Sequence, residues 1–391
     1  TIHCILIPKH WKIMNKIKNI IVMLSVMPFL FSCGDKVTEQ ENYDISGKME
    51  LEYAEQFSVR YLENGCSLIE INDGQKFMLV PENIEISEEE NITVIQQPVE
   101  NIYVGASSAV DLFDGAGAID DVKMVSTKLA DWCLPSVKNA LENGKMIYVG
   151  KYSTPDYEIL LAENCGLAVE STMIYHSPET KEQLENLGIP VLTERSSYET
   201  HPLGRLEWIK LYGLITGHEK EAEEFFNKKI EIFNDTVLDN ITENKRPTVV
   251  FFYITANGYA NVRKSGDYIS KMIELAGGQY IFTADDLKTD ENALSTMNVE
   301  METFYQKAKN ADYIIYNSTV DGGIYNISQL VEKNALLSDF KAVKNNNVWC
   351  TEKNMFQQTT GTADMIRDIH LIITGQADNA ELQFLHHLGG E

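Results

Sequence analysis

Polar and aromatic side chains follow the short apolar stretches that we predict to be buried β-strands. In open parallel sheets, ligands bind beyond the carboxyl ends of the strands, so these side chains are candidates for a binding site. The candidates share aromatic rings, polar groups or a guanidinium: Ser107, Trp132, Tyr152, Thr172, Arg195, Tyr198, Arg205, Tyr253, Tyr259, Arg263, Asn317 and Phe356. Aromatic rings supply contact area, and arginine pairs with carboxylates. This composition favours a cleft that holds a large, partly aromatic and partly anionic molecule.

Residues 198–205, with the sequence YETHPLGR, concentrate several of these groups directly before Trp208. Two interpretations stay open for this segment. It either contacts a ligand, or it forms the loop that leads into a helix. In the second case Arg205 pairs with an acid such as Glu199 or Glu207.

The sequence contains no pattern of a known catalytic site. It lacks the nucleophile elbow G-x-S-x-G, the P-loop, a G-x-G-x-x-G after a strand and the zinc motif H-E-x-x-H. Its six cysteines show neither a CxxC pair nor the spacing of a structural zinc site. His176 and His201 could bind a metal or a haem iron, but a lone loop histidine is more often solvated or hydrogen-bonded. We therefore expect a protein that is not an enzyme and holds no metal or cofactor of its own.

The element that organises the chain is a long amphipathic helix predicted at residues 218–241. Apolar residues recur there at steps of three and four, and glutamates load its first turns. Short apolar strands alternate with helical patterns both before and after it, which is typical of parallel sheets with covered faces. We predict an α/β fold in which one long helix joins two lobes with parallel sheets. The N-terminal lobe spans residues 99–217, the linking helix 218–243 and the C-terminal lobe 244–391.

Three further segments precede the lobes. Residues 1–33 contain upstream residues and a signal peptide, whose twelve apolar residues 20–31 are too few to span a bilayer. They end in Leu-Phe-Ser-Cys, which resembles the lipobox of bacterial lipoproteins, so Cys33 is predicted to carry a lipid. Residues 34–48 are polar and acidic and suit a flexible tether. Residues 49–98 alternate in the manner of β-strands, with a hairpin turn at Asp73-Gly74.

The net charge of −25 argues against a nucleic-acid partner, because a phosphate backbone would be repelled and no cluster of Lys and Arg offsets the repulsion.

Several segments together resemble the class III substrate-binding proteins of bacterial ABC importers, which carry iron complexes, haem or cobalamin. The segments are the lipobox, ASSAVDLF, PDYEILLAENCGLAVE, GDYISKMIELAGGQYIF and METFYQKAKNADYIIYNS, in this order. The resemblance covers roughly residues 98–375, so the β element at 49–98 lies outside it. It implies comparatively rigid lobes and a ligand in the cleft between them.

The resemblance also implies that one glutamate on each lobe docks into arginines of the membrane permease. Glu158 matches the first docking position, although Cys165-Gly166 stands where the family has Pro-Asp. Glu302 matches the second by analogy. Glu300 is its rival, because the spacing to Asp312 is two residues longer than usual.

The function that this resemblance implies is capture and delivery. We expect a monomeric receptor, anchored by its lipid in the cell envelope and facing the periplasm or the exterior. It would hand a small metal complex to an ABC permease and, through it, to the ATPase. The cargo would be an iron-siderophore complex, haem or a cobalamin-type corrinoid, and the candidate residues do not separate these. The alternatives are a metal-handling enzyme or metallochaperone on a related fold, and a capture lipoprotein without a permease.

Overall fold

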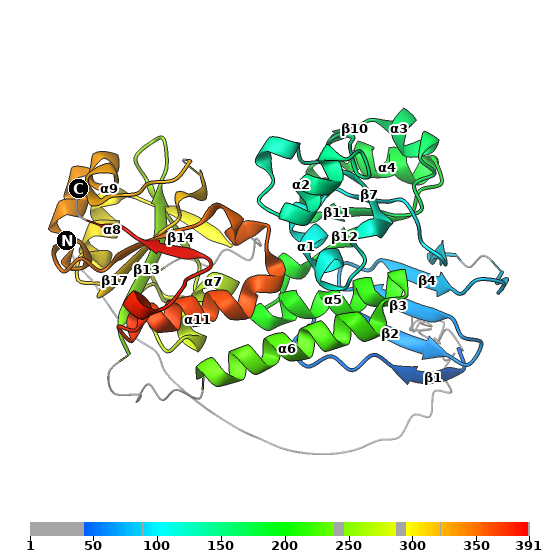
Figure 1. The fold of residues 1–391 in the computed structure, drawn as a ribbon, viewed down its shortest axis with the longest axis horizontal. Helices are drawn as coiled ribbons and strands as arrows, with labels where there is room; N and C mark the ends of the chain where they lie inside the picture. The colour runs from blue at the N-terminus through cyan, green and yellow to red at the C-terminus, as the bar shows by residue number, and fades with distance from the viewer. Residues whose placement is uncertain (1–42, 88–89, 238–245, 287–294, 321, 390–391) are drawn as a thin grey trace, which may run out of the picture. The chain divides into compact units, whose positions relative to one another are not determined.

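The strands of the described chain form three main β-sheets, with helices packed against them (Figure 1). The computed structural model describes residues 43–87, 90–237, 246–286, 295–320 and 322–389. The predicted signal peptide, Cys33 and residues 34–42 of the tether lie outside these ranges. Asp44–Glu391 make up one compact unit, which contains both predicted lobes and the β element. Among the described helices, none has the length and apolar character needed to cross a membrane.

The predicted β element is a five-stranded sheet, called the N-terminal sheet below. Its strands lie in the order β1-β2-β3-β4-β5 and pair antiparallel except for the parallel pair β4–β5. The predicted hairpin turn lies between β3 and β4, where Gly74 adopts a φ of 93° that glycine accepts readily. β1 occupies the end of the predicted tether, because residues 45–48 find a partner in β2. The strands are β1 Ile45–Lys48, β2 Phe57–Leu62, β3 Ser67–Ile71, β4 Lys76–Val80 and β5 Thr93–Gln96.

The N-terminal lobe contains the predicted parallel sheet. Its five strands lie in the order β12-β11-β6-β7-β8, and every pair is parallel. The strands are β6 Ile102–Val104, β7 Val122–Val125, β8 Ile147–Tyr148, β11 Ala168–Ser171 and β12 Val191–Glu194; a small hairpin pairs β9 Gly150–Lys151 with β10 Thr154–Pro155. The helices are α1 Ser107–Gly115, α2 Pro135–Glu142, α3 Tyr157–Ala162 and α4 Pro178–Asn186. Because all five strands run the same way, their carboxyl ends share one edge of the sheet.

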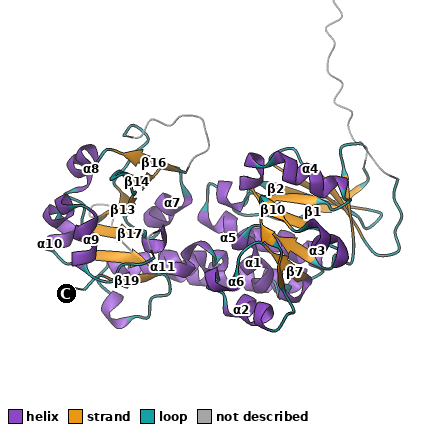
Figure 2. Cartoon of the chain, turned by 90° about the horizontal axis from the view of Figure 1, so that it is seen from above, coloured by secondary structure: helices purple, strands orange, loops and turns teal. Residues whose placement is uncertain are grey.

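The C-terminal lobe has a mixed sheet rather than the purely parallel one predicted. Parallel pairs join β13 to β17 and β17 to β18, while β14, β16 and β19 pair antiparallel. Helices α8, α9 and α10 lie on one side of this sheet and α7 and α11 on the other (Figure 2). The strands are β13 Thr248–Ile254, β14 Ala260–Arg263, β15 Gln279–Tyr280, β16 Thr296–Val299, β17 Tyr313–Tyr316, β18 Val348–Thr351 and β19 Leu385–His387. The helices are α7 Tyr268–Leu275, α8 Met301–Ala308, α9 Ile327–Lys333, α10 Lys341–Lys344 and α11 Thr362–Ile373.

Helices α5 Pro202–Thr216 and α6 Glu219–Val237 run beside each other, below the sheets of the two lobes and next to the N-terminal sheet (Figure 1). α6 is the described part of the predicted linking helix; residues 238–243 lie outside the described ranges. It packs against α5, which follows β12 of the N-terminal lobe, and against α11 of the C-terminal lobe. Lys229 of α6 forms a 2.6 Å ion pair with Asp364 of α11. α5 begins inside the segment that the sequence left open as a loop.

Short 3-10 turns complete the fold. They are η1 Ile119–Asp121, η2 Leu129–Asp131, η3 Thr172–His176, η4 Ser196–Tyr198, η6 Ser318–Val320, η7 Ala335–Asp339, η8 Lys353–Phe356, η9 Thr359–Gly361 and η10 Ala377–Asn379. Two of them matter for the site: η4 follows β12, and η9 leads into α11.

Candidate ligand-binding site

A polar cavity opens at the carboxyl edge of the N-terminal lobe's sheet. Its volume is about 390 Å³, and we call it the polar cavity. It contains two of the predicted ligand residues, Ser107 and Tyr152. The ammonium of the exposed Lys151 also lies there, and α1 begins at the cavity wall without a side-chain cap, so its positive end faces the same space. The full lining is Gly105, Ala106, Ser107, Ser108, Ser126, Thr127, Lys151, Tyr152 and Ser171.

A buried carboxyl group lies directly behind this cavity. Glu170 on β11 is 0% exposed, and neither of its oxygens has a hydrogen-bond partner within the described part of the chain. Burial raises its pKa to about 8, a shift that the neighbouring Tyr103 hydroxyl opposes. A Cβ at position 105 would lie 2.1 Å from a Glu170 oxygen, so any side chain there would displace the carboxyl group of Glu170. Glu170 is therefore protonated at neutral pH.

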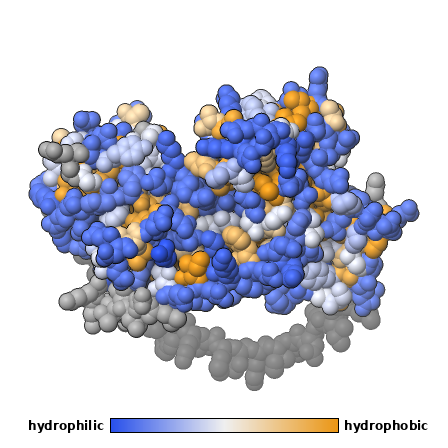
Figure 3. Space-filling model, in the orientation of Figure 1, coloured by the Kyte–Doolittle hydropathy of each residue, from blue (hydrophilic) through white to orange (hydrophobic). Residues whose placement is uncertain are grey.

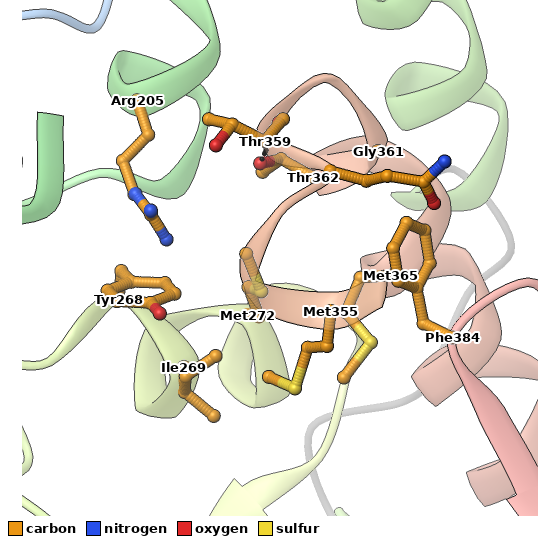
Figure 4. Close-up of a pocket in the computed structure, with 11 residues that line it drawn as sticks. Arg205, Tyr268, Ile269, Met272, Met355, Thr359, Gly361, Thr362, Met365 and Phe384 are labelled. Atoms are coloured by element: carbon orange, nitrogen blue, oxygen red, sulfur yellow. Dashed lines mark hydrogen bonds between the residues drawn. The ribbon is translucent and has the colours of Figure 1, made fainter. Parts of the chain in front are cut away.

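A second cavity lies where α5 of the N-terminal half meets α7 and α11 of the C-terminal lobe, and we call it the arginine cavity (Figure 4). Its most unusual member is Arg205, whose guanidinium carbon lies 3.9 Å from the centre of the Tyr268 ring. The cavity has room for about one water molecule, roughly 10 Å³. The lining is Arg205, Tyr268, Ile269, Met272, Met355, Gln358, Thr359, Gly361, Thr362, Met365 and Phe384.

Arg205 has neither a hydrogen bond nor an ion pair among the residues that the structure describes, although it is only 8% exposed. The suggested pairing with Glu199 or Glu207 is wrong. Both carboxylates accept backbone N–H groups of residues 52–56 instead. A buried guanidinium without a hydrogen-bonded anion is costly, so this arrangement favours an anionic ligand group at Arg205.

Arg263 offers a direct contrast in the same place. It lies over the same Tyr268 ring at 5.7 Å, and its Nη1 is 3.5 Å from the buried Asp267 carboxylate. Its guanidinium also lies 5.6 Å from the centre of the Phe356 ring, so these two predicted residues do come together. Burial raises the pKa of Asp267, and the charge of Arg263 opposes that shift. Arg263 thus contacts a carboxylate directly, whereas the charge of Arg205 reaches Asp267 and Glu194 without a hydrogen bond or ion pair.

One loop of the C-terminal lobe connects the two cavities. Thr359, which lines the arginine cavity, donates a 2.9 Å hydrogen bond from Oγ1 to the carbonyl of Ser108, which lines the polar cavity. The backbone N–H of Thr360 donates to Asp111 on α1 at 2.7 Å. Gln357 donates to the carbonyl of Asp131 at 2.8 Å. Because Ser108 and Thr359 are in contact, the two cavities adjoin.

Other predicted ligand residues lie elsewhere. Trp132 is 2% exposed and its indole N–H donates to the Thr127 carbonyl, so the ring packs in the core and offers no face to a ligand. Asn317 is 3% exposed, and its side-chain oxygen accepts from the hydroxyl of Thr319. The remaining ones are partly exposed and line neither cavity: Thr172, Arg195, Tyr198, Tyr253 and Tyr259.

The residues that sequence reasoning missed come from helices and turns. Tyr268 and Met272 lie on α7, Thr359 on η9 and Met365 on α11. They follow no strand directly, so the strand-end rule could not find them. The available signal was the pair of small-residue stretches, TTGTAD and SGDYIS, that open α11 and α7.

The two candidate histidines differ in their surroundings. His176 is exposed at the end of η3. The Nδ1 of His201 accepts the backbone N–H of Leu203 and caps α5, and its ring stacks on Tyr53 at 4.7 Å. Burial lowers the pKa of His201. Within the described ranges, no group of three or more His, Cys, Asp or Glu side chains could hold a metal ion.

The predicted docking glutamates are both exposed on helices. Glu158 lies in the first turn of α3 and Glu302 in the first turn of α8. Glu300, the rival, precedes α8, and its carboxylate raises the pKa of Tyr259.

Comparisons with known proteins agree with this architecture. A family model described as periplasmic binding protein matches residues 103–354, more than half of the chain. An uncharacterised lipoprotein of Methanocaldococcus jannaschii is 28% identical over 321 residues, which cover 78% of this chain and 73% of that protein. A second lipoprotein of that organism is 25% identical over 315 residues, with coverages of 78% and 77%.

Solved structures show the same fold. A periplasmic binding protein from Veillonella parvula gives a TM-score of 0.58 at 17% identity and covers 71% of this chain and 93% of its own. The periplasmic haem-binding protein HutB of Vibrio cholerae gives 0.56 at 18% identity, with coverages of 69% and 98%. Because the sequence identities are this low, these matches establish a shared fold and nothing further.

Proposed function

The chain belongs to the periplasmic binding protein family, and from this premise we propose that it is the substrate-binding lipoprotein of an ABC importer. Proteins of this family bind substrates for transporters, so the chain is a binding protein and not an enzyme. Its cargo is an iron chelate, either a siderophore complex or haem, or else a cobalamin-type corrinoid. The cargo is captured between the lobes and delivered to a membrane permease. The lipoprotein relatives support a location in the cell envelope.

The observation that carries this proposal is the unpaired Arg205. In a chain with a net charge of −25, a buried guanidinium without a hydrogen-bonded carboxylate among the described residues is an exception, and an anionic ligand would supply the missing partner. Carboxylate and phenolate oxygens are common on iron chelates, and haem carries two propionates. Anionic chelates therefore suit Arg205 better than the neutral amides that surround a corrin ring.

The two adjoining cavities support a ligand larger than one of them. The polar cavity supplies hydroxyl groups and Lys151, while the arginine cavity supplies Tyr268 and the methionine side chains. A ligand that bridges the contact between Ser108 and Thr359 would touch both lobes at once. That the fold neighbour HutB is named a haem-binding protein agrees with this class of ligand.

A thermal-shift panel tests the proposal directly. The full chain is heated with haemin, ferric siderophores, cyanocobalamin or cobinamide, each in excess. A ligand at 100 times its dissociation constant adds about 2.7 kcal/mol to the free energy of unfolding, which gives a visible shift. We expect an anionic iron chelate to give the largest shift.

Arg205→Gln should weaken binding of that ligand by at least about tenfold, because the anionic group loses its charged partner. Arg246→Gln is the matched control, since Arg246 is exposed and its guanidinium donates to the carbonyl of Glu274. Equal affinity in the two variants would contradict the role of Arg205. Absence of a shift with every compound would contradict the proposed class of cargo.

A further inference from the structure

The N-terminal sheet lies outside the segment that matches the family, yet the N-terminal lobe holds it with buried carboxylates. Glu207, 0% exposed, accepts the backbone N–H groups of Glu52, Tyr53 and Ala54 at 2.8–3.1 Å. Glu199, 2% exposed, accepts those of the next two residues at 2.7 and 3.1 Å, and also the indole N–H of Trp208 at 2.7 Å. Five consecutive N–H groups directed at two carboxylates fix residues 52–56 firmly against α5.

A second attachment joins the sheet to the edge strand β12. Gln75, in the turn before β4, donates from Nε2 to the carbonyl of Val191 at 2.9 Å. Its Oε1 accepts the backbone N–H of Thr193 at 2.9 Å. The side-chain amide of Gln75 thus satisfies the backbone of β12 as a neighbouring strand would. The sheet is therefore bonded to the strand that ends at Glu194, immediately before Arg195.

Arg195 is where these attachments converge. Its Nε donates to Oε1 of Gln56 at 3.1 Å, and Gln56 ends the segment that Glu199 holds. Its Nη1 donates at 3.2 Å to the hydroxyl of Tyr175, which in turn donates to Asp73 of the sheet at 2.6 Å. The guanidinium lies 4.5 Å from the centre of the Tyr198 ring. Its Nη2 has no hydrogen bond with any described residue.

The position of Arg195 makes this arrangement relevant to a ligand. Glu194 pairs in register with Ser171, which lines the polar cavity, so Arg195 follows the strand at the same carboxyl edge. A free arginine side chain samples many rotamers, and fixing it in one of them costs entropy. A guanidinium that is already oriented loses less freedom when an anion binds it.

We propose that the N-terminal sheet positions Arg195 for the cargo, with Gln56 as the positioning residue that holds the guanidinium through Nε. The inference rests on the proposed function, because it takes Arg195 as a ligand contact. It gives residues 45–96 a role in recognition: the sheet itself touches no cargo, and it sets the direction of a side chain that does.

A double-mutant cycle tests this role in the full chain, with the tightest ligand of the panel. Gln56→Ala should weaken binding by about tenfold, because the Arg195 guanidinium loses the acceptor oxygen that holds it. In an Arg195→Ala background, Gln56→Ala should have no further effect. Gln96→Ala is the matched control, because Gln96 lies in β5 of the same sheet and its Nε2 donates to the carbonyls of Val80, Pro81 and Gln97. An unchanged affinity in Gln56→Ala, or an undiminished loss in the Arg195→Ala background, would overturn the inference.

A ligand-free measurement separates this inference from the proposed function. The Nε–H of Arg195, identified by its disappearance in Arg195→Ala, should exchange slowly with solvent in the wild type and in Gln56→Glu. It should exchange fast in Gln56→Ala. Fast exchange in the wild type would overturn the positioning role whatever the ligand is. Slow exchange in a protein that binds nothing in the panel would leave Gln56 supported as the group that holds Arg195 and would count against the proposed cargo alone.

Discussion

Three buried carboxyl groups show how much a partner matters for a single side chain. Burial raises the pKa of Asp111 and of Asp368 to about 6, while each accepts backbone N–H groups that oppose the shift. Glu170 has no such bond among the described residues, and its pKa is raised further, to about 8. A carboxyl group that keeps its proton in the folded chain and loses it in the unfolded chain couples stability to pH.

Glu170 should therefore make the protein less stable as the pH rises. Its usual pKa is 4.5, so between about pH 4.5 and 8 the folded chain holds a proton that the unfolded chain has released. Over this range the group lowers the free energy of unfolding by about 1.4 kcal/mol per pH unit. Glu170→Gln removes this dependence. Urea unfolding should therefore show the free energy of unfolding of the variant rising relative to that of the wild type from pH 5 to pH 8.

Glu142→Gln, on the exposed surface of α2, is the control for this comparison and should follow the wild type at every pH. If Glu170→Gln also ran parallel to the wild type, Glu170 would have to be ionised in the folded chain.

At the same scale, the sequence predicted some site residues and not others. Ser107 and Tyr152 were found because each lies close after a strand whose carboxyl end borders the polar cavity. Trp132 lies seven residues beyond the end of β7, and in that distance the chain turns the ring into the core. Arg205 was predicted as a ligand residue and does line a cavity, but the sequence could not show that its guanidinium has no hydrogen-bond partner among the described residues. Only the fold shows that residues 52–56 occupy the two carboxylates nearest to it in sequence.

Among the elements, the crossing of α5 and α6 depends on one glycine. A Cβ at Gly213 would lie 2.6 Å from the Cβ of Ala222 and 3.0 Å from the carbonyl of His218. The backbones of the two helices can approach this closely only because position 213 has no side chain. This crossing connects α5, which carries Arg205, to the helix that also packs on α11.

Gly213→Ala should therefore destabilise the protein by about 1–3 kcal/mol, although alanine is the better helix former, because the crossing becomes overpacked. Gly213→Val should cost more. Urea unfolding measures both, and Gly266→Ala is the control, since a Cβ there meets no atom within 4 Å. A Gly213→Ala protein as stable as the wild type would show that the crossing can widen without loss.

The two helices also show what sequence patterns can predict at this scale. α6 was predicted because its apolar residues form one stripe and acids fill its first turn. α5 is buried around almost its whole circumference, so it has no stripe, and its first turn was left open as a loop. Its beginning was marked nevertheless by Pro202 at the first helical position. The C-terminal sheet was expected to be parallel because its antiparallel strands β14, β16 and β19 are short and show no clear alternation.

For the whole molecule, the dominant property is its negative charge. The surface seen in Figure 3 is mostly hydrophilic, with small apolar patches. A net charge of −25 allows long-range attraction to a basic partner, and it makes any single acid a weak candidate for specific docking. The order of motifs along the chain predicted the family and the two-lobe fold. The docking role of Glu158 and Glu302 stays a prediction of the family resemblance, supported by their exposure on α3 and α8.

Charge reversal at these two positions tests delivery separately from capture. Glu158→Arg and Glu302→Arg should leave the affinity for the cargo unchanged, because both side chains lie outside the two cavities. Each should weaken docking to a permease with basic docking residues by about tenfold or more, since attraction turns into repulsion. Uptake of the labelled cargo by cells that carry the importer measures this loss, which should shrink as salt screens the charges.

Glu182→Arg on α4 and Glu332→Arg on α9 are matched controls, because they make the same change at other exposed helical acids. Glu300→Arg decides between the two candidates on the C-terminal lobe: loss of uptake there, with Glu302→Arg unaffected, would move the docking site by two residues. If the double variant Glu158→Arg/Glu302→Arg took up cargo as fast as the controls did, docking through these acids would be wrong. With Glu300→Arg equally active, the remaining interpretation would be a lipoprotein that captures its cargo without handing it to a permease through acids on its two lobes.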